Sequence, residues 1–203
     1  MAQPVVIEIV GSLNMDLVTR TARMPEAGET LLASGFSAGY GGKGANQAVA
    51  CARLLRSSHG SEPRNGVQVK MHGAVGSGDS LGSANYIEYL QKEGIDTSGI
   101  KSKDGVGTGT AVIIVEEHNG ENRILISPGA NGKVSANDVS LDSGPGGFVM
   151  FQLEIPLDTV SHCINLVVVF ELSMFADSSM YKRSETPWQD RSSQCSAREQ
   201  ASG

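Results

Sequence analysis

The chain has 203 residues, which corresponds to one ordinary domain or slightly more. Its 16 Lys and Arg residues against 22 Asp and Glu give a net charge of −6, which argues against a nucleic-acid-binding protein because such proteins normally present a basic face. The sequence has no visible signal peptide, no apolar run long enough to span a bilayer and no metal-ligand spacing among its His and Cys residues. The three cysteines are widely spaced, as expected of reduced thiols. We therefore predict a cytoplasmic protein, with the nucleus as a second location, and no membrane or nucleic-acid partner.

The first part of the chain alternates predicted strands and helices. Val5–Val10 is a β-branched run that ends at a glycine, which is typical of a strand covered on both faces of a parallel sheet. A turn at residues 25–28 precedes a further predicted strand at residues 30–40. Alanine, valine and leucine then recur at helical spacing, which places the start of a helix close to Gly44.

The middle of the chain continues this alternation. A core strand is predicted at residues 67–75, and an amphipathic helix that ends at Gly94 follows it, capped by Asp79 or Ser80. The β-rich runs Gly109–Glu116 and 121–127 flank Asn119-Gly120, a dipeptide that favours a two-residue hairpin turn. The remaining predicted elements are a short helix at 135–141, a core strand at 148–153 and a helix at 156–166. This order predicts an α/β sandwich with a small antiparallel sheet inserted.

Two polar residues follow the first predicted strand. Asn14 and Asp16 are two positions apart, so their amide and carboxylate face the same side. Ligands of open α/β sheets bind outside the carboxyl ends of the strands, and this pair suits hydrogen bonding to vicinal hydroxyls. The alternative is an Asx turn after a strand.

A glycine-rich segment, GGKGAN at residues 41–46, stands at the predicted helix start. Its glycines would let a ligand lie against bare backbone, and the free N–H groups of a helix start attract oxygen atoms. It is not a phosphate-binding P-loop, because Gly44 and Ser37 stand where that motif needs Ser or Thr and a glycine. The alternative is a strand-to-helix turn with an exposed lysine. Glu154, after the 148–153 strand, could accept a hydroxyl proton or could be a solvated charge.

Together these segments resemble the ribokinases, within the phosphofructokinase-B family of sugar kinases. The resemblance covers residues 5–162 and is carried by GSLNMD, PEAGET, AGYGGKGANQAVA, VGSGDSLG, TGTAVIIV, GAN and FQLEIP. It implies a ribokinase-like, Rossmann-type three-layer sandwich with an inserted small β lid sheet, whose strands lie within residues 16–40 and 98–128. The lid would cover the sugar and pair two subunits into a homodimer. The resemblance also implies that the ribose hydroxyls contact Asn14, Asp16, Gly42, Lys43, Asn46 and Glu154.

The resemblance stops after Leu166. Ribokinases carry an ATP site, a metal-binding Asn/Glu segment and an Asp-Thr-x-Gly-Ala-Gly-Asp motif in their C-terminal half, and the last Asp of that motif is the catalytic base. No segment of this sequence matches them, and the GSGD at residues 76–79 matches an early turn of the family instead. We therefore expect residues 1–166 to be the N-terminal part of a truncated ribokinase-like domain. Residues 167–203, rich in Ser, Arg, Gln and Glu, are predicted to be a disordered tail outside the family.

The family implies an enzyme that uses ATP and Mg²⁺ to phosphorylate D-ribose at the 5-hydroxyl. Because neither the base nor the ATP and metal sites have a counterpart here, we expect this chain to be inactive and assign it no catalytic, cofactor-binding or metal-binding residue. Three alternatives stay open: a kinase for another sugar or a nucleoside, a sugar-binding or regulatory protein without catalysis, and a product with no function of its own.

Overall fold

The computed structural model describes residues 5–56, 66–78, 83–142 and 147–176. Contacts within the chain divide it into two units, residues 1–165 and residues 166–203. Among the described residues, no helix combines the length and the apolar character needed to cross a membrane.

The first unit is built on a four-stranded parallel sheet of order β5-β4-β1-β8. Its strands are β1 (Val5–Val10), β4 (Val67–Gly76), β5 (Ile95–Lys103) and β8 (Phe148–Phe151). The strand β1 lies between β4 and β8, which confirms the reading of its β-branched run as a covered strand. Because all four strands run in the same direction, their carboxyl ends meet at one edge of the sheet.

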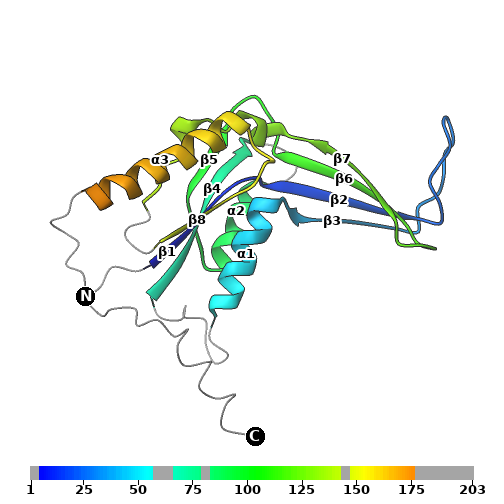
Figure 1. Cartoon of the computed structure of the whole chain (residues 1–203). Coiled ribbons are helices and arrows are strands. Elements are labelled where there is room, and N and C mark those ends of the chain that lie inside the picture. Colours follow the sequence, from blue (N-terminus) through cyan, green and yellow to red (C-terminus); the bar gives the residue numbers. More distant parts are fainter. Residues whose placement is uncertain (1–4, 57–65, 79–82, 143–146, 177–203) are drawn as a thin grey trace, which may run out of the picture. The chain divides into compact units, whose positions relative to one another are not determined.

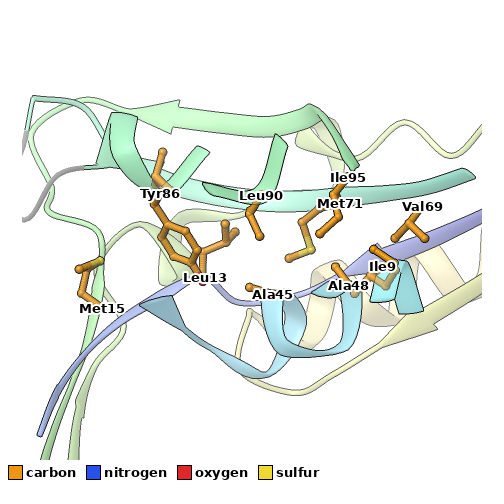
Figure 2. Close-up of a cluster of buried hydrophobic side chains, with 12 residues drawn as sticks. Ile9, Leu13, Met15, Ala45, Ala48, Val69, Met71, Tyr86, Leu90 and Ile95 are labelled. Carbon is orange, nitrogen blue, oxygen red and sulfur yellow. The ribbon is translucent and has the colours of Figure 1, made fainter. Parts of the chain in front are cut away.

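Two helices, α1 (Lys43–Leu55) and α2 (Ser83–Lys92), pack on one face of this sheet. Figure 2 shows the cluster between them, in which small alanines of α1 face larger side chains of α2 and the strands. Its labelled members include Ala45, Ala48, Tyr86, Leu90, Ile9, Leu13 and Met71. On the other face, Val10 and Ala74 pack against Ala130, Val134 and Val160. The first unit therefore has the three layers that the resemblance implied.

A second four-stranded sheet has the order β3-β2-β6-β7 and extends beyond the parallel sheet (Figure 1). Its strands are β2 (Asn14–Thr21), β3 (Gly35–Gly41), β6 (Gly109–Glu116) and β7 (Asn122–Ser127). The outer pairs are antiparallel, but the central pair β2–β6 is parallel, with Asn14 opposite Gly109. The predicted antiparallel sheet is therefore a mixed sheet. Since β2 follows β1 and β6 follows β5, both strands leave the same edge of the parallel sheet and run in the same direction.

The hairpin between β6 and β7 has a longer connection than the predicted two-residue turn. Glu116 still pairs with Glu121, since its N–H donates to the Glu121 carbonyl at 2.9 Å, so residues 117–120 form the loop. Gly120 has a φ of 73°, in the left-handed region, and its N–H donates to the Glu116 carbonyl at 2.8 Å. The prediction of a turn at Gly120 is confirmed, but the predicted loop length of two residues was wrong.

Other boundaries also differ from the sequence predictions. The strand predicted at 30–40 begins only at Gly35, and the helix predicted at 135–141 is a short 3₁₀ helix, Ala136–Asp138. The strand β5 was missed because Ile95 and Ile100 are its only large apolar residues and they do not alternate along the strand. Its residues 98–103 fall in the range expected for the lid but belong to the parallel sheet. The predicted caps Asp79 and Ser80 lie outside the described residues.

Helix α3 spans Leu157–Ala176 and crosses the boundary between the two units. The structure has residues 167–176 as helix, where the sequence predicted the start of a disordered tail. The run VVVFELSMFA contains no glycine or proline to end the helix begun at Leu157. The part of the predicted tail from residue 177 onward lies outside the described residues.

Candidate functional site

Asn14 and Glu154 come to the same edge of the parallel sheet. β1 ends at Val10 and leads through residues 11–13 to Asn14, whereas β8 ends at Phe151, opposite Val10, and leads to Glu154. Because β1 and β8 are parallel neighbours, the residues that follow them lie close together. Both side chains line one cavity of about 330 Å³.

The carboxylate of Glu154 is held by Ser12 and Lys43. The Ser12 hydroxyl donates to Oε2 at 2.6 Å, and the Lys43 backbone N–H donates to the same oxygen at 3.2 Å. The Lys43 Nζ lies 2.9 Å from Oε1. Burial alone would raise the pKa of Glu154, but the hydrogen bonds from Ser12 and Lys43 outweigh it and hold the pKa below its usual value. Glu154 is therefore held as an ionised carboxylate that accepts hydrogen bonds from Ser12 and Lys43.

Asp16 shares the electrostatic environment of Glu154. Partial burial raises the pKa of Asp16, and the negative charge of Glu154 raises it further. The Asp16 carboxylate lies against Gly41, where an added Cβ would stand 2.0 Å from Asp16 Oδ2. A side chain at position 41 would have to displace this carboxylate from its observed place.

Gly42 precedes α1 and has a φ of 91°, which L side chains rarely adopt. An added Cβ would meet the Asn14 nitrogen and the Ser12 carbonyl oxygen, each at 2.8 Å. From its sequence, Gly42 is predicted to leave space for a ligand. In the structure, a side chain at Gly42 would overlap the protein's own backbone, and the glycine lets α1 begin directly against the Ser12–Asn14 segment.

Five of the six predicted contact residues gather around this point, namely Asn14, Asp16, Gly42, Lys43 and Glu154. Asn46 is exposed on α1, and within the described ranges no hydrogen bond or ion pair joins its side chain to the other five. The roles of all six residues in sugar binding stay predictions.

Ser12 and Asn131 are site residues that sequence reasoning did not single out. Ser12 is fully buried and donates to Glu154, while Asn131 is 1% exposed and donates to the Asn14 side chain at 2.8 Å. Both belong to segments that carry the family resemblance, GSLNMD and GAN. Their positions, as polar residues within segments that carry the family resemblance, were the signal that could have identified them.

Within the part of the chain that the structure describes, no group of three or more His, Cys, Asp or Glu side chains is arranged to hold a metal ion.

Comparisons with known proteins agree with this fold. Residues 6–144 match the family model described as pfkB family carbohydrate kinase. A ribokinase of Schizosaccharomyces pombe is 43% identical over 165 residues, which are 79% of this chain and 49% of the relative. A deoxyribokinase of Salmonella typhi is 38% identical over 161 residues, 78% of this chain and 48% of the relative.

A similar solved structure is that of Arabidopsis thaliana ribokinase complexed with ribose and ATP. It has 28% identity and a TM-score of 0.57, and the match covers 80% of this chain and 50% of that one. The chain thus spans about half the length of the curated relatives it matches. Because the family model matches well over half of its residues and its relatives share its α/β fold, this chain belongs to the pfkB family of carbohydrate kinases.

Proposed function

We propose that this chain provides the sugar-binding part of a ribokinase-type kinase, with ribose as its ligand. The observation that carries the proposal is that Asn14 and Glu154 line one cavity. Asp16 is close enough to Glu154 for the negative charge of Glu154 to raise its pKa. Carboxylates accept hydrogen bonds from hydroxyls, and a side-chain amide both donates and accepts. The ribose in the Arabidopsis structure and the ribokinase relative from Schizosaccharomyces pombe support this assignment.

In the whole enzyme, the proposed reaction transfers the γ-phosphoryl group of ATP to the 5-hydroxyl of ribose. Such catalysis consists mainly of positioning and electrostatic stabilisation, and ATP and Mg²⁺ supply the phosphoryl group and its charge neutralisation. The residues of this chain would bind and orient the sugar. Asp16 and Glu154 accept hydrogen bonds from its hydroxyls, while Lys43 keeps Glu154 ionised and in place.

Calorimetric titration of the 203-residue chain with ribose tests the binding. Asp16→Ala should weaken binding about 10- to 100-fold, since a hydrogen bond to a charged group contributes about 1.5–3 kcal/mol. Asp96→Ala is the matched control. Asp96 is the second residue of β5, at the opposite end of the strands of the parallel sheet, and it accepts a local hydrogen bond from the Ser98 N–H at 2.8 Å. Equal ribose affinity for wild type and Asp16→Ala would overturn the assignment.

The identity of the sugar is tested in the same titration. The Salmonella deoxyribokinase relative makes 2-deoxyribose the natural competitor. We expect ribose to bind more tightly. Tighter binding of 2-deoxyribose would move the proposal to that sugar.

We also propose that this chain does not transfer phosphate by itself, and that sugar binding without catalysis is its activity. The motif that holds the catalytic base in ribokinases has no counterpart in the sequence. Loss of a general base lowers a rate about 10²–10⁴-fold, and loss of an oxyanion donor about 10²–10³-fold. We expect no ribose-dependent ADP formation with ATP and Mg²⁺.

Asp79→Ala is the control in this assay. Turnover that disappears in Asp79→Ala would contradict the proposal and identify Asp79, which lies outside the described residues, as the base. Turnover that is unchanged in Asp79→Ala and is lost on further purification would come from a contaminating kinase.

Finally, we propose that two copies pair through the β3-β2-β6-β7 sheet. The strand register places Leu17, Val112 and Leu125 on the face opposite Asn14 and Asp16. Leu125 is 70% exposed, and a large exposed apolar face of this kind marks an interaction surface. In sedimentation velocity we expect a dimer for the wild type and a monomer for Leu125→Asp. A wild-type monomer at all concentrations would contradict the pairing.

A further inference from the structure

Asn131 forms a side-chain clamp on the segment that carries Asn14. It lies in the short 3₁₀ helix Gly129–Lys133 and is 1% exposed. Its Oδ1 accepts a hydrogen bond from the Leu13 N–H at 2.9 Å. Its Nδ2 donates to the Leu13 carbonyl at 2.9 Å and to Asn14 Oδ1 at 2.8 Å.

This network fixes which way both amides face. The Leu13 N–H can only donate and the Leu13 carbonyl can only accept, so Oδ1 and Nδ2 of Asn131 have one possible assignment. Because Asn131 Nδ2 is a donor, the Asn14 atom beside it must be the acceptor, Oδ1. A flipped Asn14 would place two NH₂ groups together inside the protein, which is unfavourable for buried polar groups.

We propose that Asn131 is a positioning residue that turns the Nδ2 of Asn14 toward the cavity, so that Asn14 presents a hydrogen-bond donor to the sugar. This inference rests on the proposed sugar binding. Asn14 and Asp16 lie on the same face of β2, two positions apart. A sugar hydroxyl between them then donates its proton to the Asp16 carboxylate and accepts from the Asn14 amide. An Asn14 amide that faced the other way would offer a second acceptor, and one hydroxyl has only one proton to donate.

The two amides pack closely against Gly109. Gly109 pairs with Asn14 across the β2–β6 ladder. A Cβ at Gly109 would lie 2.1 Å from Asn131 Nδ2 and 2.3 Å from Asn14 Oδ1. The glycine therefore makes space for the hydrogen bond between the two amides, and both Asn14 and Asn131 line the same cavity.

A double-mutant cycle with the 203-residue chain tests the inference, with ribose affinity as the readout. Asn131→Asp keeps the acceptor for the Leu13 N–H but removes the donor to both the Leu13 carbonyl and Asn14 Oδ1, so the Asn14 amide is free to flip. We expect ribose to bind about tenfold more weakly than to wild type. In an Asn14→Ala background the same Asn131→Asp change should have a much smaller effect, because only the lost hydrogen bond to the Leu13 carbonyl remains to act. An equal fold-loss in both backgrounds would overturn the inference.

Asn14→Asp tests the orientation without altering Asn131. One carboxylate oxygen still accepts from Asn131, and the other presents an acceptor to the cavity in place of the donor. We expect Asn14→Asp to bind ribose at least as weakly as Asn14→Ala. Retention of wild-type affinity by Asn14→Asp would mean that Asn14 serves as an acceptor, which would overturn the inference even if Asn131→Asp does not fold.

Failure of the proposed function is recognised separately, because it appears as absence of ribose binding by the wild type. In that case the urea midpoints of the same four proteins still test the clamp. We expect the two substitutions to be strongly non-additive, and additive midpoints would show that the two amides are not coupled.

Discussion

The hydroxyl of Tyr86 donates a hydrogen bond to the main-chain carbonyl of Gly41. Tyr86 is a fully buried residue of α2, and Gly41 is the last residue of β3, so this bond joins a helix of the parallel-sheet layers to the second sheet. The Tyr86 ring also stacks on Tyr40 of β3, with 4.6 Å between ring centroids. Burial, together with the negative charge of Asp16, raises the pKa of Tyr86, so the hydroxyl keeps its proton and remains a donor.

Tyr86→Phe should lower the free energy of unfolding by about 1–3 kcal/mol, because the Gly41 carbonyl loses its partner while the ring stacking is kept. Urea denaturation measures the change. Tyr89→Phe is the control, since the Tyr89 hydroxyl only accepts an exposed hydrogen bond from Arg53 at 3.4 Å. A Tyr89→Phe effect as large as that of Tyr86→Phe would contradict this role for the Gly41 contact.

Gly42→Ala should destabilise the chain more than Gly105→Ala. Both glycines have positive φ, 91° and 71°, so both substitutions carry a backbone penalty of about 1–2 kcal/mol. Only at Gly42 would the new methyl group meet backbone atoms, at 2.8 Å, whereas no atom lies within 4 Å at Gly105. The difference between the two, about 1–3 kcal/mol in urea denaturation, isolates the overlap with the Ser12–Asn14 segment. Equal losses would show that this segment moves aside freely.

Ribose affinity should fall in mildly acidic solution because Asp16 takes up a proton. The pKa of Asp16 is raised by burial and by Glu154, so Asp16 protonates at a higher pH than an ordinary aspartate. The pKa of Glu154 is lowered, so it stays ionised through that window. In titration calorimetry, the ribose affinity of the wild type should decrease once as the pH is lowered. Asp16→Asn should bind ribose weakly at every pH, without this decrease. The same decrease in Asp16→Asn would mean that another group takes up the proton.

The same two carboxylates have opposite effects on stability. The pKa of Asp16 is raised in the folded state, so ionised Asp16 lowers the free energy of unfolding at neutral pH. This loss of stability is relieved as the pH falls through the folded-state pKa. Glu154, with a lowered pKa, contributes stability above its unfolded-state pKa, and this contribution is lost as the pH falls through the folded value. Asp16→Asn should therefore raise the urea midpoint at pH 7, and Glu154→Gln should lower it. Shifts of the same sign would contradict these environments.

Polar residues at strand ends made much of the site predictable. The run Val5–Val10 has a single plausible structure, and the topology of parallel sheets then places Asn14 beside the residue that follows the last strand, Glu154. The direction of the β2–β6 pair was not predictable from local pattern, because it depends on where β6 leaves the parallel sheet. The bond between Asn131 and Asn14 spans 117 positions, and periodicity carries no information on such distant contacts.

The hydrogen bond between Ser12 and Glu154 joins residues 142 positions apart. During synthesis Ser12 leaves the ribosome long before Glu154, so the cavity cannot form until β8 has been made and has paired with β1. Contacts at such separation carry a large loop-closure entropy and form late. A ligand that binds only the finished site stabilises the folded state by mass action. The proposed binding of ribose would therefore stabilise the folded chain, and ribose added during expression should raise the folded fraction that can be recovered.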